Sequence, residues 1–147
     1  MSARAVVVQA DPGFLTTAAG ALRAAGFHTA AFLDSMGALE ALRSTQRIKV
    51  LVTCMRLPVG TPDGVALARM AQKWRPDLRV LFTDMPDLVP LAEGLGEFLA
   101  IPATELDVVS AVRRMMTSIE WVKVSGGAGM HRSLGRLVPR VARSFLT

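Results

Sequence analysis

Short runs of β-branched and other apolar residues recur along the first hundred positions of the chain. Runs of this length and composition are typical of buried strands. Five of them are predicted to be strands, at positions 5–8, 29–32, 50–53, 79–82 and 98–101.

Between these runs, apolar residues return every three or four positions, a spacing that predicts helices with one buried face. The first helix is expected from Pro12 to about Ala25, where Gly26 ends it. The faces expected to point inward in the helices are Leu15, Ala19 and Leu22; Met36, Leu39 and Leu42; Leu67, Met70, Ala71 and Trp74; and Val108, Val109, Val112 and Met115.

Polar residues that favour helix N-termini precede these helices. Asp11 is expected to cap the first helix, Ser35 the second and Asp63 the third. Thr104 and Asp107 form a variant of the capping box at the start of the last helix.

The segment between the fourth and fifth strands is the least regular. It contains Pro86 and Pro90, with Gly94 and Gly96 near its end. Proline removes a helix donor and clashes with the preceding turn, so a short or irregular helix is expected here.

Alternating strands and helices predict an α/β fold, because parallel neighbours in a sheet need a crossover connection. We predict a flavodoxin-like, doubly wound five-stranded parallel sheet of order 2-1-3-4-5 with a C-terminal extension. In such a sheet, ligands bind beyond the carboxyl ends of the strands, where the order reverses. This rule indicates residues 9–11, after the first strand, and residues 54–56, after the third.

Composition restricts the class of protein. The chain has 147 residues, enough for one domain and a tail, and although 51% of them are hydrophobic, none of the apolar runs reaches the roughly 20 residues of a membrane-spanning helix. A single cysteine, Cys54, excludes an internal disulfide and a cysteine-rich metal cluster. We therefore expect a soluble, cytoplasmic protein.

The net charge of +5 is concentrated in the tail. Residues 1–116 nearly balance their charges, whereas residues 117–147 hold one acidic residue and five basic ones: Lys123, Arg132, Arg136, Arg140 and Arg143. We divide the chain into a domain at 1–117 and a basic C-terminal extension at 118–147.

Within the extension, residues 121–124 are expected to form a short strand and residues 125–129 a hinge. Residues 132–145 have the spacing of a short amphipathic helix, although Pro139 interrupts it. We favour a helix that docks on its own domain or on a second copy, and keep binding to nucleic acid or to an acidic membrane as alternatives.

Several of these features together resemble the receiver domains of bacterial two-component response regulators, over residues 4 to about 117. The features are the five-unit layout, Arg56-Leu57-Pro58 and Asp63-Gly64 after the third strand, Thr83 at the end of the fourth, and Phe98-Leu-Ala-Ile-Pro102 before the last helix. The resemblance implies the CheY-like form of the predicted fold and a role in signalling rather than an enzymatic one.

The resemblance also implies where receiver chemistry would take place, and this chain departs from the pattern there. Members carry a phosphoryl group on an aspartate that falls on Cys54, and bind Mg²⁺ with an acidic pair that falls on Gln9 and Ala10. The lysine of the family falls on Ile101, and only Thr83 keeps the expected hydroxyl. Because Mg²⁺ needs hard oxygen ligands and an acyl phosphate needs a carboxylate, we predict a degenerate site without metal or cofactor.

Other reactive residues have simpler explanations. Cys54 is either a thiol sensor or a small apolar residue that fills space, and we favour the second. Asp11 and Asp63 are explained as helix caps, and Asp84 is expected in the loop after the fourth strand. Phe98 matches the position of an aromatic switch in the family, but core packing is favoured.

We therefore predict a non-phosphorylatable protein-interaction module that binds a protein partner or a second copy and has no small-molecule substrate. Its expected interaction face comprises Phe98, Val109, Val112 and Arg113. The alternatives are phosphoryl transfer to an unusual residue, a redox switch at Cys54, and nucleic-acid or membrane binding through the tail.

Overall fold

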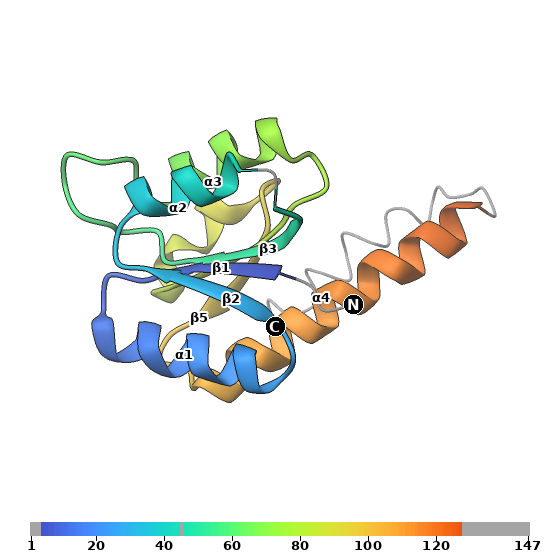
Figure 1. The fold of residues 1–147 in the computed structure, drawn as a ribbon, viewed down its shortest axis with the longest axis horizontal. Helices are drawn as coiled ribbons and strands as arrows, with labels where there is room; N and C mark the ends of the chain where they lie inside the picture. Colours follow the sequence, from blue (N-terminus) through green and yellow to red (C-terminus); the bar gives the residue numbers. More distant parts are fainter. Residues whose placement is uncertain (1–3, 45, 128–147) are drawn as a thin grey trace.

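Five strands and five helical segments alternate along the chain (Figure 1). The computed structural model describes residues 4–44 and 46–127, with side chains described up to residue 117. The elements are β1 (Arg4–Val8), α1 (Pro12–Ala24), β2 (His28–Phe32), α2 (Ser35–Leu42), β3 (Ile48–Thr53), α3 (Gly64–Trp74), β4 (Arg79–Asp84), the 3₁₀ helix η1 (Pro86–Ala92), β5 (Glu97–Ala100) and α4 (Glu105–Gly127).

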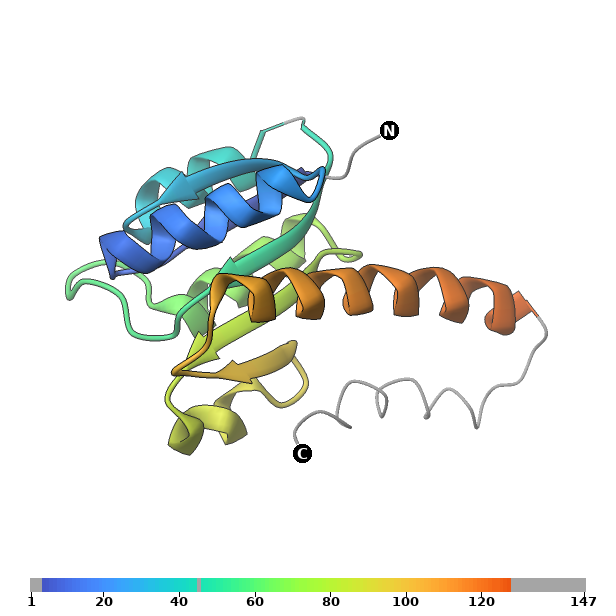
Figure 2. The ribbon, with the colours of Figure 1, turned by 90° about the horizontal axis from the view of Figure 1, so that it is seen from below.

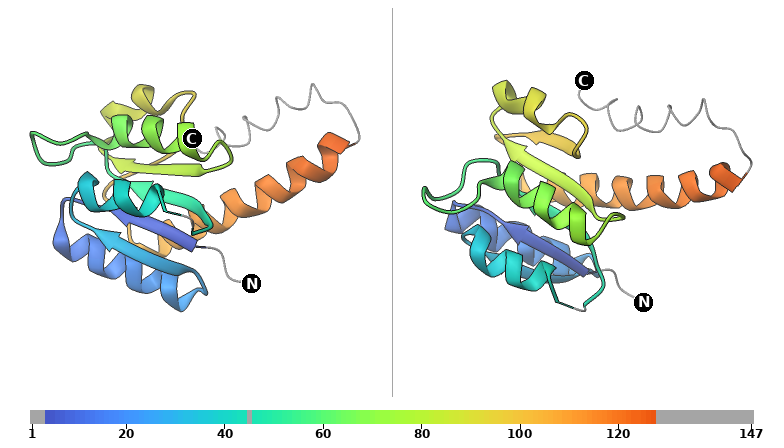
Figure 3. Two further views of the ribbon diagram at one scale, coloured as in Figure 1. Left: turned by 45° about the horizontal axis from the view of Figure 1, so that its top comes forward. Right: turned by 90° about the horizontal axis from the view of Figure 1, so that it is seen from above.

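The sheet has the order β2-β1-β3-β4-β5, and all neighbouring strands are parallel. This confirms the predicted flavodoxin-like arrangement. Helices α2 and α3 cover one face of the sheet, and α1 and α4 cover the other (Figures 1 and 3). All strands therefore end at one edge of the molecule, where the first residue of each following helix also lies.

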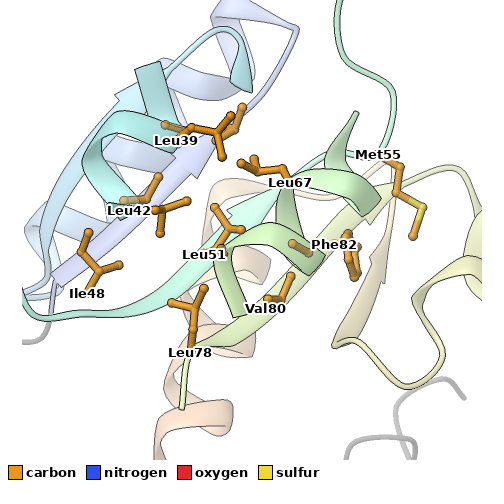
Figure 4. Packing of buried hydrophobic residues seen from close by; sticks show 14 of the residues in the cluster. Leu39, Leu42, Ile48, Leu51, Met55, Leu67, Leu78, Val80 and Phe82 are labelled. Carbon is orange, nitrogen blue, oxygen red and sulfur yellow. The ribbon is translucent and has the colours of Figure 1, made fainter. Parts of the chain in front are cut away.

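Side-chain alternation along the strands fills two separate cores, because successive residues of a strand point to opposite faces. In β1, Val6 and Val8 pack on the α2/α3 side, whereas Ala5 and Val7 pack on the α1/α4 side. Figure 4 shows the first of these cores, in which Leu51, Leu67 and Phe82 are fully buried.

Most of the predicted caps are confirmed. Asp11 accepts a hydrogen bond from the Gly13 N–H, and Asp63 accepts one from the Ala66 N–H. Thr104 and Asp107 bond reciprocally through their backbone N–H groups and side chains.

The cap of α2 was predicted one residue late. Asp34, not Ser35, accepts hydrogen bonds from the N–H groups of Met36 and Gly37. Ser35 is instead the first helical residue and is fully buried. Both residue types are good caps, so their order in the sequence did not decide between them.

Two residues predicted to face inward are exposed. Met36 is 56% exposed because the buried stripe of α2 runs through Ser35, Ala38, Leu39 and Leu42. Trp74 is 43% exposed at the last position of α3, where the guanidinium of Arg43 lies 5.5 Å from the centre of its ring.

The irregular fourth segment is confirmed as a 3₁₀ helix, η1, with Pro86 in its first turn and Pro90 inside it. It lies beside the carboxyl end of the sheet (Figure 2). The next strand, β5, has only four residues.

The strand predicted at residues 121–124 is wrong, because α4 continues as a helix to Gly127. Its 23 residues correspond to about 34 Å at 1.5 Å per residue, and the helix projects past the amino ends of the strands (Figure 2). The first residues of the predicted hinge, 125–127, are also helical. The expected amphipathic segment, 132–145, with Arg132, Arg136, Arg140 and Arg143, lies outside the described residues.

Helix α4 crosses the predicted boundary between residues 117 and 118 without interruption, and the division into two parts stays a prediction. Among the helices that the structure describes, none combines the length and apolar character needed to cross a membrane.

Candidate functional site

Backbone pairing continues one residue beyond several strands and positions the candidate site. The N–H of Gln9 donates to the carbonyl of Phe32 at 3.1 Å, and the N–H of Cys54 donates to the carbonyl of Val8 at the same distance. The N–H of Ile101 donates to the carbonyl of Asp84 at 3.0 Å. The side chains at these positions are therefore held by the ends of the sheet rather than by free loops.

A cleft of about 580 Å³ lies at these strand ends. It brings together every position that the resemblance indicated, and it is lined by Gln9, Ala10, Asp11, Phe14, Cys54, Arg56, Thr83, Asp84, Ile101, Pro102 and Ala103. The predicted site residues therefore meet in space, although they come from four separate strand ends.

A buried hydrogen bond connects two of these strand ends. The amide Nε2 of Gln9 donates to Oγ1 of Thr83 at 2.8 Å, and both residues are almost fully buried. The position that would hold a metal carboxylate in the family thus holds an amide that bonds to the hydroxyl at the end of β4.

Asp84 is the residue of the site that sequence reasoning missed. It was expected in a loop, but it is the last residue of β4 and only 2% exposed. A usable signal existed: Arg56 follows β3 and Asp84 ends β4, and because these strands are neighbours, opposite charges meet at one edge of the sheet.

The carboxylate of Asp84 accepts five hydrogen bonds. Its Oδ2 accepts from the backbone N–H groups of Met55 at 2.9 Å and Arg56 at 3.1 Å. Its Oδ1 accepts from the Met85 N–H at 2.8 Å and from Nε and a terminal nitrogen of Arg56 at 3.0 and 2.6 Å. Both oxygens are thus engaged within the protein.

These contacts determine the charge state of Asp84. Burial would raise the pKa of its carboxyl group, but the guanidinium of Arg56 and the three backbone N–H groups outweigh burial and hold the pKa below its usual range. The same pair raises the pKa of the Arg56 guanidinium. Asp84 is therefore an ionised, internally neutralised carboxylate.

Cys54 is 9% exposed, and its Sγ donates to the carbonyl of Arg56 at 3.2 Å. Burial raises the pKa of the thiol and outweighs the backbone hydrogen bond of Ala10, which lowers it. The charge of Asp84 also raises the pKa, and the guanidinium of Arg56 has a smaller lowering effect. A raised pKa leaves little thiolate, the form that reacts.

Three of the four residues expected to form an interaction face are in the cores. Phe98 packs on the α2/α3 side, and Val109 and Val112 pack on the α1/α4 side, with exposed fractions of 7% or less. Only Arg113 is exposed. The apolar stripe of α4 faces its own sheet, so these side chains do not form a surface.

The donor set in the cleft does not fit Mg²⁺. Both oxygens of Asp84 are occupied by internal donors, and Gln9 turns its amide nitrogen toward Thr83. The side chain of Ala10 has no ligand atom, and Asp11 is a lone carboxylate that also caps α1. Within residues 4–44 and 46–127, no three histidine, cysteine or carboxylate side chains gather as a metal site would require. Cys54, for its part, has no carboxylate on which to form an acyl phosphate.

Comparison with known proteins gives matches in structure only. A scan against protein-family models finds no match, and neither does a search of curated proteins. Many solved structures, however, are similar to this chain.

A response regulator receiver protein from Sinorhizobium medicae has a TM-score of 0.70 and 22% identity, covering 79% of this chain and 95% of that one. A CheY-like receiver domain protein from Methanospirillum hungatei has a TM-score of 0.72 and 15% identity, covering 82% and 98%. NtrX from Brucella abortus, in complex with ATP, has a TM-score of 0.76 and 19% identity over 90% of this chain and 31% of its own. The chain therefore has the fold of response regulator receiver domains.

Proposed function

We propose that this chain is a receiver-like domain of signal transduction that does not accept a phosphoryl group and acts by binding a protein. The observation that carries the proposal is the cleft at the strand ends. There Cys54 stands where a carboxylate would be needed, and the buried carboxylate next to it, Asp84, has its charge and both oxygens satisfied internally.

The chemistry of phosphoryl transfer supports this proposal. A transferred phosphoryl group needs a nucleophile, a metal ion and a counter-charge. The cleft offers a thiol with a raised pKa, a single open carboxylate at Asp11 that also caps α1, and the alkyl side chain of Ile101.

A binding role is supported by the exposed apolar residues of the same end of the molecule. Among the side chains that the structure describes, seven large apolar ones are exposed, and six of these lie near the carboxyl ends of the strands: Leu33, Met36, Val59, Met85, Leu91 and Leu106. Apolar side chains gathered at one end of a domain favour contact with another protein.

The test of the phosphoryl part is intact-mass measurement after incubation with acetyl phosphate and Mg²⁺. A receiver domain that keeps its aspartate, treated in parallel, shows that the donor is active. We expect an unchanged mass for this chain. A stoichiometric gain of one phosphoryl group would refute the proposal.

The binding part is tested separately by sedimentation and chemical cross-linking of the full chain. We expect a complex, with a second copy or a different protein, that is weakened in the variant Leu91→Ser/Leu106→Ser and retained in the control Trp74→Ser, which removes an exposed apolar side chain from the opposite end of the domain. A chain that remains monomeric and forms no cross-linked complex in cell extract contradicts the interaction role.

A further inference from the structure

In the described part of the chain, acidic residues gather at one end of the sheet and basic residues at the other. In a parallel sheet with helical crossovers, all strands begin at one end, where the helices also finish. The acidic caps Asp11, Asp34 and Asp63 lie at the carboxyl end of the sheet, as do Asp84 and Asp107. This end has one basic residue close to the cleft, Arg56, and it is paired with Asp84.

Basic residues gather at the opposite end, which we call the basic end and define by five exposed residues. Arg4 opens β1, Lys49 lies near the start of β3, Arg43 caps the C-terminus of α2, Arg47 precedes β3 and Lys73 is in the last turn of α3. Because β1 and β3 are neighbours and α2 lies beside α3, these residues share one end of the molecule (Figure 3).

The charges of the basic end are available to a partner. None of the five makes an ion pair with another residue of the described part of the chain, where Arg56–Asp84 is the pair within 4.0 Å. The acidic residues at this end are Glu40, Asp77, Glu93 and the half-buried Glu97. Of these, Glu97 interacts electrostatically with Arg114 and Arg79 rather than with the five.

Hydrogen bonds connect two helix ends at the basic end. The guanidinium of Arg75 donates to the carbonyls of Leu42 at 2.8 Å and Ser44 at 2.7 Å, which ties the end of α3 to the end of α2. Arg43 lies over the ring of Trp74 at 5.5 Å from its centre. These contacts connect the ends of α2 and α3, while the five basic side chains themselves stay exposed.

From this arrangement we infer that the basic end binds the sugar–phosphate backbone of nucleic acid. A polyanion needs charge and hydrogen-bond donors, which this end supplies, and it needs no apolar surface. A membrane surface or a protein interface would call for exposed apolar side chains. Among the side chains that the structure describes, the basic end has one large exposed apolar residue, Trp74, and the other such residues lie near the carboxyl end.

This inference does not depend on the proposed function, because it concerns the end of the molecule opposite the cleft. It assigns different partners to the two ends, a protein at the carboxyl end and nucleic acid at the amino end. Helix α4 projects from the amino end as well (Figure 2).

The test is fluorescence anisotropy of a labelled DNA duplex of mixed sequence titrated with the full chain at several salt concentrations. The variant Arg47→Gln/Lys73→Gln removes two charges from the basic end. The matched control Arg69→Gln/Arg113→Gln removes two exposed charges from the middle of α3 and α4. Circular dichroism checks that both variants are folded.

Binding should weaken steeply with salt, and the slope of log K against log salt should fall by about two units in the first variant, about one for each lost phosphate contact. The control should leave the slope unchanged. Anionic lipid vesicles and an acidic peptide should compete poorly with the duplex.

Three results would overturn the inference. The duplex does not bind, or both double variants weaken binding equally, or vesicles or peptide bind in preference to the duplex. A further variant, with Arg132, Arg136, Arg140 and Arg143 changed to glutamine, measures the contribution of the tail. If this variant no longer binds the duplex while Arg47→Gln/Lys73→Gln binds as the natural chain does, the basic end is not the binding site.

Discussion

The carboxylate of Asp84 connects the segments that follow β3 and β4. It bonds to the backbone N–H groups of Met55 and Arg56, which follow β3, and to that of Met85, which follows β4. A single buried side chain thus satisfies three backbone donors at the end of the sheet, donors that would be costly to leave without a partner.

Replacing this acceptor should be destabilising. In Asp84→Asn, the amide nitrogen cannot accept, and at least one buried N–H loses its partner, so we expect the free energy of unfolding to fall by about 2 kcal/mol or more. Urea unfolding measures this loss. The exposed Asp87→Asn is the control and should change stability by less than about 0.5 kcal/mol; equal effects would show that the bonds of Asp84 are not stabilising.

The lowered pKa of Asp84 also predicts a pH dependence. A carboxyl group whose pKa is lower in the folded state stabilises the fold fully above its unfolded pKa, about 3.9, and this contribution disappears as pH falls through the folded value. The stability difference between the natural chain and Asp84→Asn should therefore be constant near neutral pH and shrink below about pH 4. A difference that grows in acid would contradict the lowered pKa.

Cys54 offers a direct test of the redox alternative. Because burial raises the pKa of its thiol and Sγ bonds to the Arg56 carbonyl, little thiolate forms at neutral pH. We expect a thiol reagent to label the folded chain several times more slowly than the same chain in urea, because the folded state both raises the pKa of the thiol and buries it. If the folded and the unfolded chain were labelled at equal rates, the hypothesis that Cys54 is a redox sensor would be favoured again.

At the scale of elements, the first residue of α3 packs directly on the backbone after β3, because this residue is a glycine and has no side chain. The N–H of Gly64 donates to the Met55 carbonyl at 2.8 Å, and a Cβ at this position would lie 1.9 Å from the carbonyl oxygen of Cys54. This close approach places the loop after β3 against the start of the helix.

Two glycine substitutions should therefore have opposite effects. Gly64→Ala forces the Cys54 backbone to move, and we expect a loss of more than about 2 kcal/mol of stability. Gly20→Ala, inside α1 with nothing near its Cβ position, should gain about 0.5–1 kcal/mol from helix propensity. Thermal unfolding of the two variants compares them, and a stabilised Gly64→Ala would be incompatible with the packing described.

The elements differ in how well their sequences predict them. The strands and their order followed from apolar runs such as that of β3, whose residues Val50 to Thr53 are all fully buried and leave little choice of structure. The inward face of a helix was less certain at its ends: Trp74 fits the periodicity of α3, yet the sheet does not reach it.

Long-range contacts were the part of the site that local patterns could not predict. The positions Gln9, Cys54 and Thr83 were found by their place after strands, but the bond between Gln9 and Thr83 spans 74 residues. The role of Asp84 likewise depends on its distance from Arg56 across two neighbouring strands, which neither residue's local sequence reveals.

At the scale of the whole molecule, one sheet separates two cores that share its strands. Leu51 belongs to the core on the α2/α3 side and Leu22 to the core on the α1/α4 side, and both are fully buried. Because successive residues of β1 and β3 contribute to opposite cores, disrupting one core should loosen the strands that hold the other.

This coupling predicts that truncating a leucine in either core destabilises the whole domain. Leu51→Ala and Leu22→Ala should each lower the free energy of unfolding by about 2–5 kcal/mol, and each should unfold in one cooperative transition. Hydrogen exchange followed by mass spectrometry of peptides from both layers tests this, since protection should fall in both layers for either variant.

If Leu22→Ala loosened only α1 and α4 while α2 and α3 kept their protection, the two layers would be separate folding units, and the ends of the sheet could move independently. The cleft and the basic end share strands β1 and β3, so a sheet that unfolds as one unit would hold the two surfaces in fixed relation.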